Sequence, residues 1–224
     1  MVFDFYGTLA VSASAALHRA GADRVAAALG VADETHYRVL TTTFEERATG
    51  SCGDLTQTME WVAARCDHQP SAAQLASACE MRRSIEAGYA RMLRDDAEAV
   101  LSALRARGVK IGLLSDCTHE LPEVWPTLPI ARYVDATVFS VEAGIRKPHP
   151  SLYERVCVSL DVAAAGCLYV GDGGSGELTG AQAAGMTAYR LLSEDGVHAL
   201  VYDADSNWTG GTIRSLTDVL SLVR

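Results

Sequence analysis

The sequence predicts an α/β fold in which a doubly wound parallel sheet is interrupted by an all-helical insertion, and three observations predict it. An apolar strand pattern stands at the start of the chain, over Val2–Phe5. Helical periodicity then runs without a strand over residues 14–92. After Asp95, short apolar strands alternate with helices, which is typical of a parallel sheet covered on both faces. The simplest architecture is therefore one α/β core with an inserted helical cap.

The insertion contains four segments whose apolar residues recur at helical spacing. The expected helices cover residues 17–29, 37–48, 55–66 and 75–89. Gly30 and Gly50 are placed to end the first two, because glycine readily adopts the conformation that closes a helix. Four consecutive helices with short connections indicate a small bundle. We therefore expect a cap domain of residues 13–92 and a core domain of residues 1–12 plus 93–224.

In the remainder of the chain, strands and helices are expected to alternate. The expected strands cover residues 110–115, 136–140, 167–170 and 187–192, and the expected helices cover 97–107, 150–160 and 177–184. Together with the first strand they make a Rossmann-like sheet. Ligands of such sheets bind outside the carboxyl ends of the strands. Four of those ends carry polar groups: Asp4, Ser115-Asp116, Arg146-Lys147 and Asp172.

The composition of the chain excludes several classes of partner. Of 224 residues, 49% are hydrophobic and 21% are charged, and the formal net charge is −9. A surface with this charge repels nucleic acids and anionic membranes, so we expect neither as a partner. No apolar run approaches the length of a membrane span, and no secretion signal opens the chain, so we expect a cytoplasmic protein with reduced, mostly buried cysteines. The oligomeric state cannot be inferred from the sequence.

Three stretches carry residue types suited to phosphate chemistry. Asp4 stands at a strand end before the turn at Gly7, where a nucleophile would lie beside backbone N–H groups that can hold a phosphoryl oxygen. Lys147, one of only two lysines, could supply a positive point charge. Asp172 and Glu177 suit a hard cation such as Mg²⁺. The alternatives are an ordinary strand-to-turn aspartate and a solvated surface lysine.

Taken in order, these stretches resemble one known family. D-F-Y-G-T-L, L-L-S-D, R-K-P-H-P and V-G-D-G-G-S-G-E are similar to the four signatures of the haloacid dehalogenase superfamily. The resemblance spans the whole chain, since the helical block falls where that family inserts its cap. It implies a hydrolase with the family's α/β core and a helical cap.

The resemblance also implies a role for each matching residue. Asp4 would attack the substrate and form an aspartyl intermediate, and Lys147 would balance the negative charge. Asp172 would bind Mg²⁺ together with Asp4 and the backbone carbonyl of Tyr6, with Glu177 behind them or bound through water. The remaining implied contacts are hydrogen bonds from Ser115 and Thr8 to the transferred group, and loop orientation or substrate contact by Asp116.

One departure from the family pattern leaves the reaction open. Phosphatases of this family carry a second aspartate where this chain has Tyr6, whereas the dehalogenases have tyrosine there. Dehalogenases, however, have serine at the place of Asp172, and two close carboxylates need a compensating cation. We therefore expect a Mg²⁺-dependent hydrolase of a small phosphorylated metabolite, with Tyr6 as a proton donor or a group that positions water.

Two other readings remain. The chain could be a metal-independent 2-haloacid dehalogenase that uses Asp4 as nucleophile, with Arg38 of the cap holding the substrate carboxylate. It could also be an inactive relative that binds a phosphorylated ligand. Arg47, near the end of a cap helix, is a further residue that could face the substrate.

Overall fold

The computed structural model describes residues 1–192 and 204–223. Within these residues, six parallel strands form one sheet in the order β3-β2-β1-β4-β5-β6. The strands are β1 (Val2–Phe3), β2 (Gly112–Ser115), β3 (Ala136–Phe139), β4 (Leu168–Gly171), β5 (Thr187–Leu191) and β6 (Gly211–Ile213). The predicted parallel sheet is confirmed, and the edge strand β6 was not among the expected elements.

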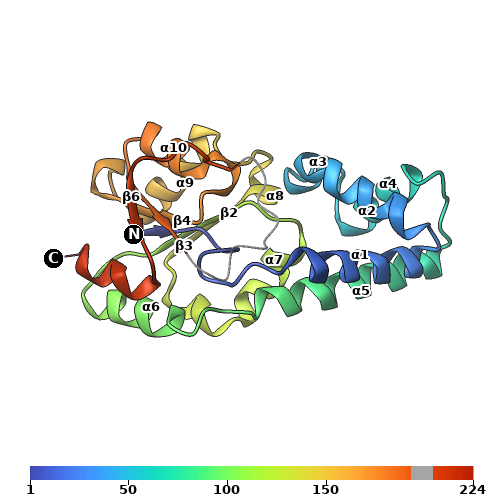
Figure 1. Ribbon diagram of the computed structural model, residues 1–224, viewed down its shortest axis with the longest axis horizontal. Helices are drawn as coiled ribbons and strands as arrows, with labels where there is room; N and C mark the ends of the chain where they lie inside the picture. Colours follow the sequence, from blue (N-terminus) through green and yellow to red (C-terminus); the bar gives the residue numbers. More distant parts are fainter. Residues whose placement is uncertain (193–203, 224) are drawn as a thin grey trace.

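Helices cover both faces of the sheet, so the fold is doubly wound as expected. The flanking elements are α6 (Ala97–Ala106), α7 (Glu120–Val124) and η6 (Leu216–Ser221) on one face, and α9 (Pro150–Leu160) and α10 (Glu177–Ala183) on the other. Figure 1 shows α9 and α10 above the sheet and α6 below it. Val2 and Phe3, both fully buried, belong to opposite apolar clusters, because successive side chains of a strand point to opposite faces.

Short elements complete the core. They are α8 (Ser140–Ala143) and the 3-10 helices η1 (Trp125–Thr127), η2 (Pro129–Tyr133), η3 (Ala164–Gly166) and η4 (Gly174–Gly176). No helix of residues 1–192 or 204–223 combines the length and the hydropathy of a membrane span. All six cysteines are unpaired and five of them are buried.

Five helices lie beside the sheet, and four of them share an apolar cluster of their own (Figure 1). The five are α1 (Ala15–Leu29), α2 (Asp33–Thr42), α3 (Phe44–Ala48), α4 (Leu55–Ala64) and α5 (Ala72–Ala90). Their cluster includes Val25, Leu29, Met59 and Val62. The bundle is therefore packed internally. The division into a cap of residues 13–92 and a core of the rest stays a proposal.

The prediction of one helix over residues 37–48 is wrong, because the helix is interrupted at Thr43. The backbone of Thr43 is not helical, with φ −124° and ψ 30°. Its hydroxyl donates to the carbonyl of Val39 at 2.6 Å, and the hydroxyls of Thr41 and Thr42 donate to the carbonyl of Arg38. Three consecutive threonines thus bond back to the preceding turn, a pattern that competes with helix continuation.

Local signals set the other helix ends. The backbone of Gly30 is left-handed, with φ +79°, and its N–H donates to the carbonyl of Ala26, so α1 ends where glycine predicted. Ser71 and Gln74 form a reciprocal capping box that starts α5. The segments entering and leaving the bundle run side by side, since the Val11 N–H donates to the carbonyl of Met92 at 2.7 Å. We call this paired crossing the neck.

The sheet order determines where a ligand can bind. From β1 the chain passes to β2 and β3 on one side, and then returns to β4 on the other. The order therefore reverses between β1 and β4, and the crevice at the carboxyl ends of these two strands is where open α/β sheets bind ligands. Asp4 follows β1 and Asp172 follows β4, so both carboxylates emerge there.

Candidate active site

The loop after β1 holds Asp4 in a fixed position. The backbone N–H of Asp4 donates to the carbonyl of Val170 at 2.9 Å, which ties the residue to β4. Gly7 has φ +83°, a left-handed conformation that glycine adopts without steric cost. Arg94 donates to the carbonyls of Gly7 and Thr8 at 2.9 and 2.8 Å. The turn is thus pinned on two sides, and Asp4 is buried, with 5% of its surface exposed.

Lys147 is buried and paired, so the reading as a solvated surface lysine is wrong. Its ammonium donates to Asp4 Oδ1 at 2.7 Å and to Glu177 Oε2 at 2.6 Å. Burial alone would lower the pKa of Lys147, but the charges of Asp4 and Glu177 raise it well above its usual range. The side chain therefore stays positive beside Asp4.

Glu177 is saturated with hydrogen bonds. Besides Lys147, its Oε2 accepts from the hydroxyl of Tyr169 at 2.7 Å, and its Oε1 accepts from the N–H of Gly173 at 2.8 Å. The hydroxyl of Tyr153 donates to the backbone carbonyl of Glu177 at 2.9 Å. The sequence analysis did not single out either tyrosine. Both lie in an apolar cluster, and only their hydroxyl groups distinguish them from ordinary packing residues. The arrangement makes Glu177 a group that positions Lys147.

Three carboxylates meet at this point. Asp4, Asp172 and Glu177 each have an oxygen within 4.8 Å of the others. Burial, with the charge of Glu177 added, raises the pKa of Asp172 to about 6. Burial also raises the pKa of Asp4 well above its usual value; Lys147 opposes this rise, and Glu177 and Asp172 add to it. Lys147 therefore offsets only part of the repulsion among the three carboxylates.

This cluster fits a hard divalent cation. Three ionised carboxylates and one ammonium leave an excess of two negative charges, and Asp4 and Asp172 offer oxygen ligands of the kind that Mg²⁺ prefers. Asp172 can lie close to the turn after β1 only because residue 7 is glycine. A Cβ on residue 7 would lie 2.1 Å from Asp172 Oδ2. Of the predicted metal ligands, the two carboxylates lie together; ligation by the carbonyl of Tyr6 stays a proposal.

Two buried hydroxyls beside the cluster lack a hydrogen-bond partner. Thr8 Oγ1 and Ser115 Oγ are both fully buried and unpartnered. A buried polar group without a partner costs about 1–3 kcal/mol, so unmade bonds of this kind call for an explanation. A phosphoryl group held by these two residues would satisfy both hydroxyls. Their predicted contact with a transferred group remains a proposal that this geometry favours.

Asp116 contacts the loop that carries Lys147. Its Oδ1 accepts from the backbone N–H of Lys147 at 3.0 Å, and its Oδ2 lies 3.6 Å from Nη1 of Arg146. Arg146 in turn donates to Ser175 at 3.1 Å. Asp116 thus fixes the backbone that carries Lys147, while it also lines the cavity described next.

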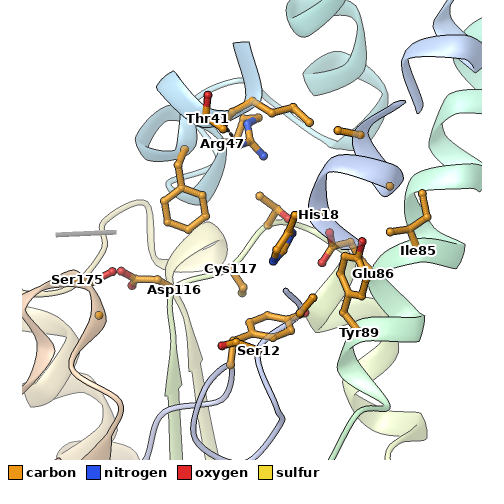
Figure 2. A pocket seen from close by; sticks show the side chains of 18 of the residues that line it. Ser12, His18, Thr41, Arg47, Ile85, Glu86, Tyr89, Asp116, Cys117 and Ser175 are labelled. Carbon is orange, nitrogen blue, oxygen red and sulfur yellow. Dashed lines mark hydrogen bonds between the residues drawn. The ribbon is translucent and has the colours of Figure 1, made fainter. Parts of the chain in front are cut away.

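A cavity of about 180 Å³ separates the core loops from the cap helices (Figure 2). Asp4, Asp172 and Lys147 line its core side. In Figure 2, His18 of α1 and Arg47 of α3 reach toward it from the cap. The other cap residues that line it include Tyr37, Leu40, Thr41, Phe44, Arg82, Ile85, Glu86 and Tyr89.

Arg38, the substrate clamp of the dehalogenase alternative, does not reach this cavity. Arg38 is exposed and is not among the residues lining the cavity, because Tyr37, Leu40 and Thr41 form the inward face of α2. Arg47, by contrast, does line it, with 5% of its surface exposed.

Tyr6 connects the core to the cap. Its ring packs edge-on against Phe5 with centroids 4.8 Å apart, and its hydroxyl hydrogen-bonds to Glu86 of α5. Burial, followed by the charge of Glu86, raises the pKa of Tyr6 well above 10. Tyr6 therefore keeps its proton at neutral pH and cannot serve as a base. Sequence reasoning missed Glu86 and Arg82, although opposite charges four residues apart beside Ile85 and Tyr89 were a usable signal.

Comparison with known proteins supports this arrangement at the level of family and fold. The sequence model of the haloacid dehalogenase-like hydrolases matches residues 1–185. A mouse haloacid dehalogenase-like hydrolase domain-containing protein 3 is 28% identical over 114 residues, which is 49% of this chain and 44% of that protein. A phosphoserine phosphatase of Thermus thermophilus is 32% identical over 97 residues, covering 43% of this chain and 39% of the relative. The chain thus matches less than half the length of these relatives.

Solved structures with the same fold include both reaction types. A 2-haloacid dehalogenase of Pseudomonas syringae superposes with a TM-score of 0.69 at 20% identity, over 99% of this chain and 96% of that one. A phosphatase of Thermococcus onnurineus gives 0.63 at 18% identity, over 99% and 95%. At such identities the likeness concerns the fold and leaves phosphatase and dehalogenase chemistry unseparated. The family match over most of the chain makes this protein a member of the haloacid dehalogenase-like hydrolases.

Proposed function

We propose that the protein is a Mg²⁺-dependent phosphomonoester hydrolase that acts on a small phosphorylated metabolite through an aspartyl-phosphate on Asp4. The observation that carries this proposal is the position of Asp172 beside Asp4, with negative charge that Lys147 only partly offsets. A metal-free dehalogenase has no use for this second carboxylate, whereas a cation site requires it.

Asp4, Lys147 and Asp172 line the core side of the cavity, and we call them the core wall. In the proposed first step they act together with the nearby hydroxyls of Thr8 and Ser115. An oxygen of Asp4 attacks phosphorus, forming the acyl-phosphate bond as the bond to the leaving oxygen breaks. Lys147 stabilises charge on Asp4 and the phosphoryl group, and Thr8 and Ser115 donate hydrogen bonds to phosphoryl oxygens. A bound Mg²⁺, held by Asp4 and Asp172, would offset the repulsion between carboxylate and phosphate dianion.

In the second step, water attacks phosphorus, releases inorganic phosphate and restores the carboxylate of Asp4. Tyr6 retains its proton, so it can donate a hydrogen bond to the leaving oxygen or hold the attacking water. It does not replace the general acid-base aspartate of typical family phosphatases. Aryl esters suit such a site as test substrates, because a phenolate can leave without prior protonation.

Dehalogenation is the second candidate, and Tyr6 is the observation that favours it. Halide also leaves without a proton, so a tyrosine in place of the acid is compatible with that reaction. Asp4 would then attack carbon and displace halide, and water would hydrolyse the resulting ester. The buried Arg47, which lines the cavity, is better placed than Arg38 to meet a substrate carboxylate.

One set of assays separates these candidates. Phenyl phosphate hydrolysis is measured with Mg²⁺ and with excess chelator, and halide release from 2-chloropropionate is measured in chelator. We expect phosphate release that needs Mg²⁺ and is lost in Asp172→Asn. Chelator-resistant halide release would overturn the proposal in favour of dehalogenation. Absence of both reactions, with binding of a phosphonate retained, would instead indicate an inactive relative that binds phosphorylated ligands.

A further inference from the structure

The cap wall of the cavity, meaning the lining residues of α1, α2, α3 and α5, faces the point where a leaving group would emerge. Asp4 and Lys147 line the opposite side, so a substrate attacked by Asp4 directs its leaving group toward these helices. Much of the wall is aromatic or aliphatic, with Tyr37, Leu40 and Ile85 from different turns and helices. Burial of the apolar groups of a ligand against such a surface is favourable, because it removes apolar area from water.

Arg82 and Glu86 of the cap wall are already paired. Arg82 lies 2.9 Å from Glu86 and 2.6 Å from Glu120 of α7, and all three side chains are largely buried. Glu86 also accepts from the hydroxyl of Tyr6. The guanidinium of Arg82 is therefore held between two carboxylates, and a substrate anion placed beside it would meet two negative neighbours.

Arg47 is the remaining cation of the wall. Arg47 donates to the backbone carbonyl of Leu40 at 2.6 Å, and its charge lowers the pKa of Glu86 against the effect of burial. His18, which points into the cavity in Figure 2, has its pKa lowered to about 4 by burial and by Arg82, so it is neutral at pH 7. With Glu120 of α7 included as the second partner of Arg82, these two arginines and two glutamates carry no net charge.

We propose that the cap wall binds the leaving group and selects an uncharged, largely apolar or aromatic alcohol, with the neutral His18 available for one hydrogen bond. This inference rests on the proposed phosphohydrolase function and names its substrate class. A second anionic group would lose its hydration beside Glu86, and the nearby Arg82 is already held between Glu86 and Glu120. Esters with an additional carboxylate or phosphate are therefore disfavoured.

The closing experiment compares two esters that differ in one charge. Phenyl phosphate and 3-carboxyphenyl phosphate break the same bond and release phenols of similar basicity. With the wild-type protein and Mg²⁺, we expect kcat/KM at least about tenfold higher for phenyl phosphate, mainly through KM, because the added carboxylate is poorly paired. Equal values, or a preference for the carboxylated ester, would overturn the inference.

A pair of variants tests whether the cap wall is the source of the selection. Leu40 is partly buried on the inward face of α2, and Leu40→Lys adds a cation there without removing the carbonyl that Arg47 uses. We expect it to reduce the preference for phenyl phosphate at least about threefold. Ala27→Lys adds the same charge on the exposed side of α1 and should leave the preference unchanged. Equal responses of the two variants would contradict the assignment.

A binding measurement keeps this inference distinct from the proposed function. Titration calorimetry with benzylphosphonate and 3-carboxybenzylphosphonate, in Mg²⁺, requires no turnover. If neither ester is hydrolysed but benzylphosphonate binds more tightly, the hydrolase proposal fails and the selection by the cap wall stands. If the carboxylated phosphonate binds as well or better, or if neither binds, the inference fails whatever the turnover.

Discussion

The two walls of the cavity are built on opposite principles. At and beside the core wall, hydrogen bonds and charges are left unmatched: the hydroxyls of Thr8 and Ser115 have no partner, and the carboxylates around Asp4 exceed the positive charge of Lys147. In the cap wall, Arg82 and Glu86 are paired before any substrate arrives, and Glu120 of α7 is the second partner of Arg82. We infer that a substrate and a cation complete the contacts of the reacting groups, whereas Arg82 and Glu86 need no partner from the substrate.

The largest effect is expected from removing the proposed nucleophile. Asp4→Asn keeps the size of the side chain and its place beside Lys147 but cannot form the acyl-phosphate, so kcat for phenyl phosphate should fall at least about 10³-fold. Benzylphosphonate should still bind, because the cap wall is untouched. Single-turnover assays with the purified variant measure the residual rate. Activity within tenfold of wild type would show that Asp4 is not the nucleophile.

A second test disturbs the core wall through one methyl group. Gly7→Ala would place Cβ 2.1 Å from Asp172 Oδ2, so we expect displacement of Asp172 and a loss of Mg²⁺-dependent activity of about 10²-fold. Gly108→Ala is the matched control. Gly108 also has a positive φ, +73°, but a Cβ there meets nothing within 4 Å. Comparable losses in both variants would mean that backbone strain, rather than the contact with Asp172, is responsible.

Tyr6 lies between the two walls and offers a test of the missing acid. Tyr6→Asp restores the carboxyl that family phosphatases carry, so turnover of an alkyl phosphate should rise by about tenfold if protonation of the leaving oxygen limits the rate. Tyr6→Phe isolates the hydroxyl that hydrogen-bonds to Glu86. Steady-state kcat for both variants decides the matter. A fall in Tyr6→Asp would assign Tyr6 a role of its own.

The smallest effect concerns the stability of the metal-free protein. The pKa of Asp172 is about 6 in the folded chain against an ordinary 3.8, so its stabilising contribution is complete below pH 4 and is lost as pH rises through 6. In chelator at pH 7, Asp172→Asn should therefore be more stable than wild type by about 3 kcal/mol, with the difference vanishing near pH 4.

Urea unfolding across this pH range measures the difference. Added Mg²⁺ should reverse the order at pH 7, because only the wild-type cluster offers both carboxylates to the ion. A variant that is less stable than wild type in chelator at every pH would contradict the account of charge repulsion around Asp172.

Much of the core was predictable because its signals are local. Helix α9 runs over Pro150–Leu160 as expected, since proline at the first helical position and the apolar spacing both lie within the segment. The meeting of Asp4 and Asp172 follows from strand ends at the edge of one parallel sheet. Sequence order and strand polarity were enough to bring residues 168 positions apart together.

The cap was less predictable because its relevant features are tertiary. The apolar spacing gave the helices but not the rotation of α2, which turns Arg38 outward and Tyr37 inward. The break at Thr43 depends on hydroxyl bonds to the preceding turn, which compete with a helical pattern that continues on both sides. Pairing of Arg82 with Glu120 joins elements 38 residues apart, and nothing within α5 alone specifies that partner.

The neck has a consequence for how such proteins diversify. The segments that enter and leave the bundle are hydrogen-bonded to each other, from Val11 to Met92. The inserted helices are therefore joined to the sheet domain at a single point. A helical module of another length or sequence, grafted between these residues, would leave the connection from β1 to β2 geometrically unchanged. New selectivities could thus arise by exchange of a whole module while the reaction centre is inherited intact.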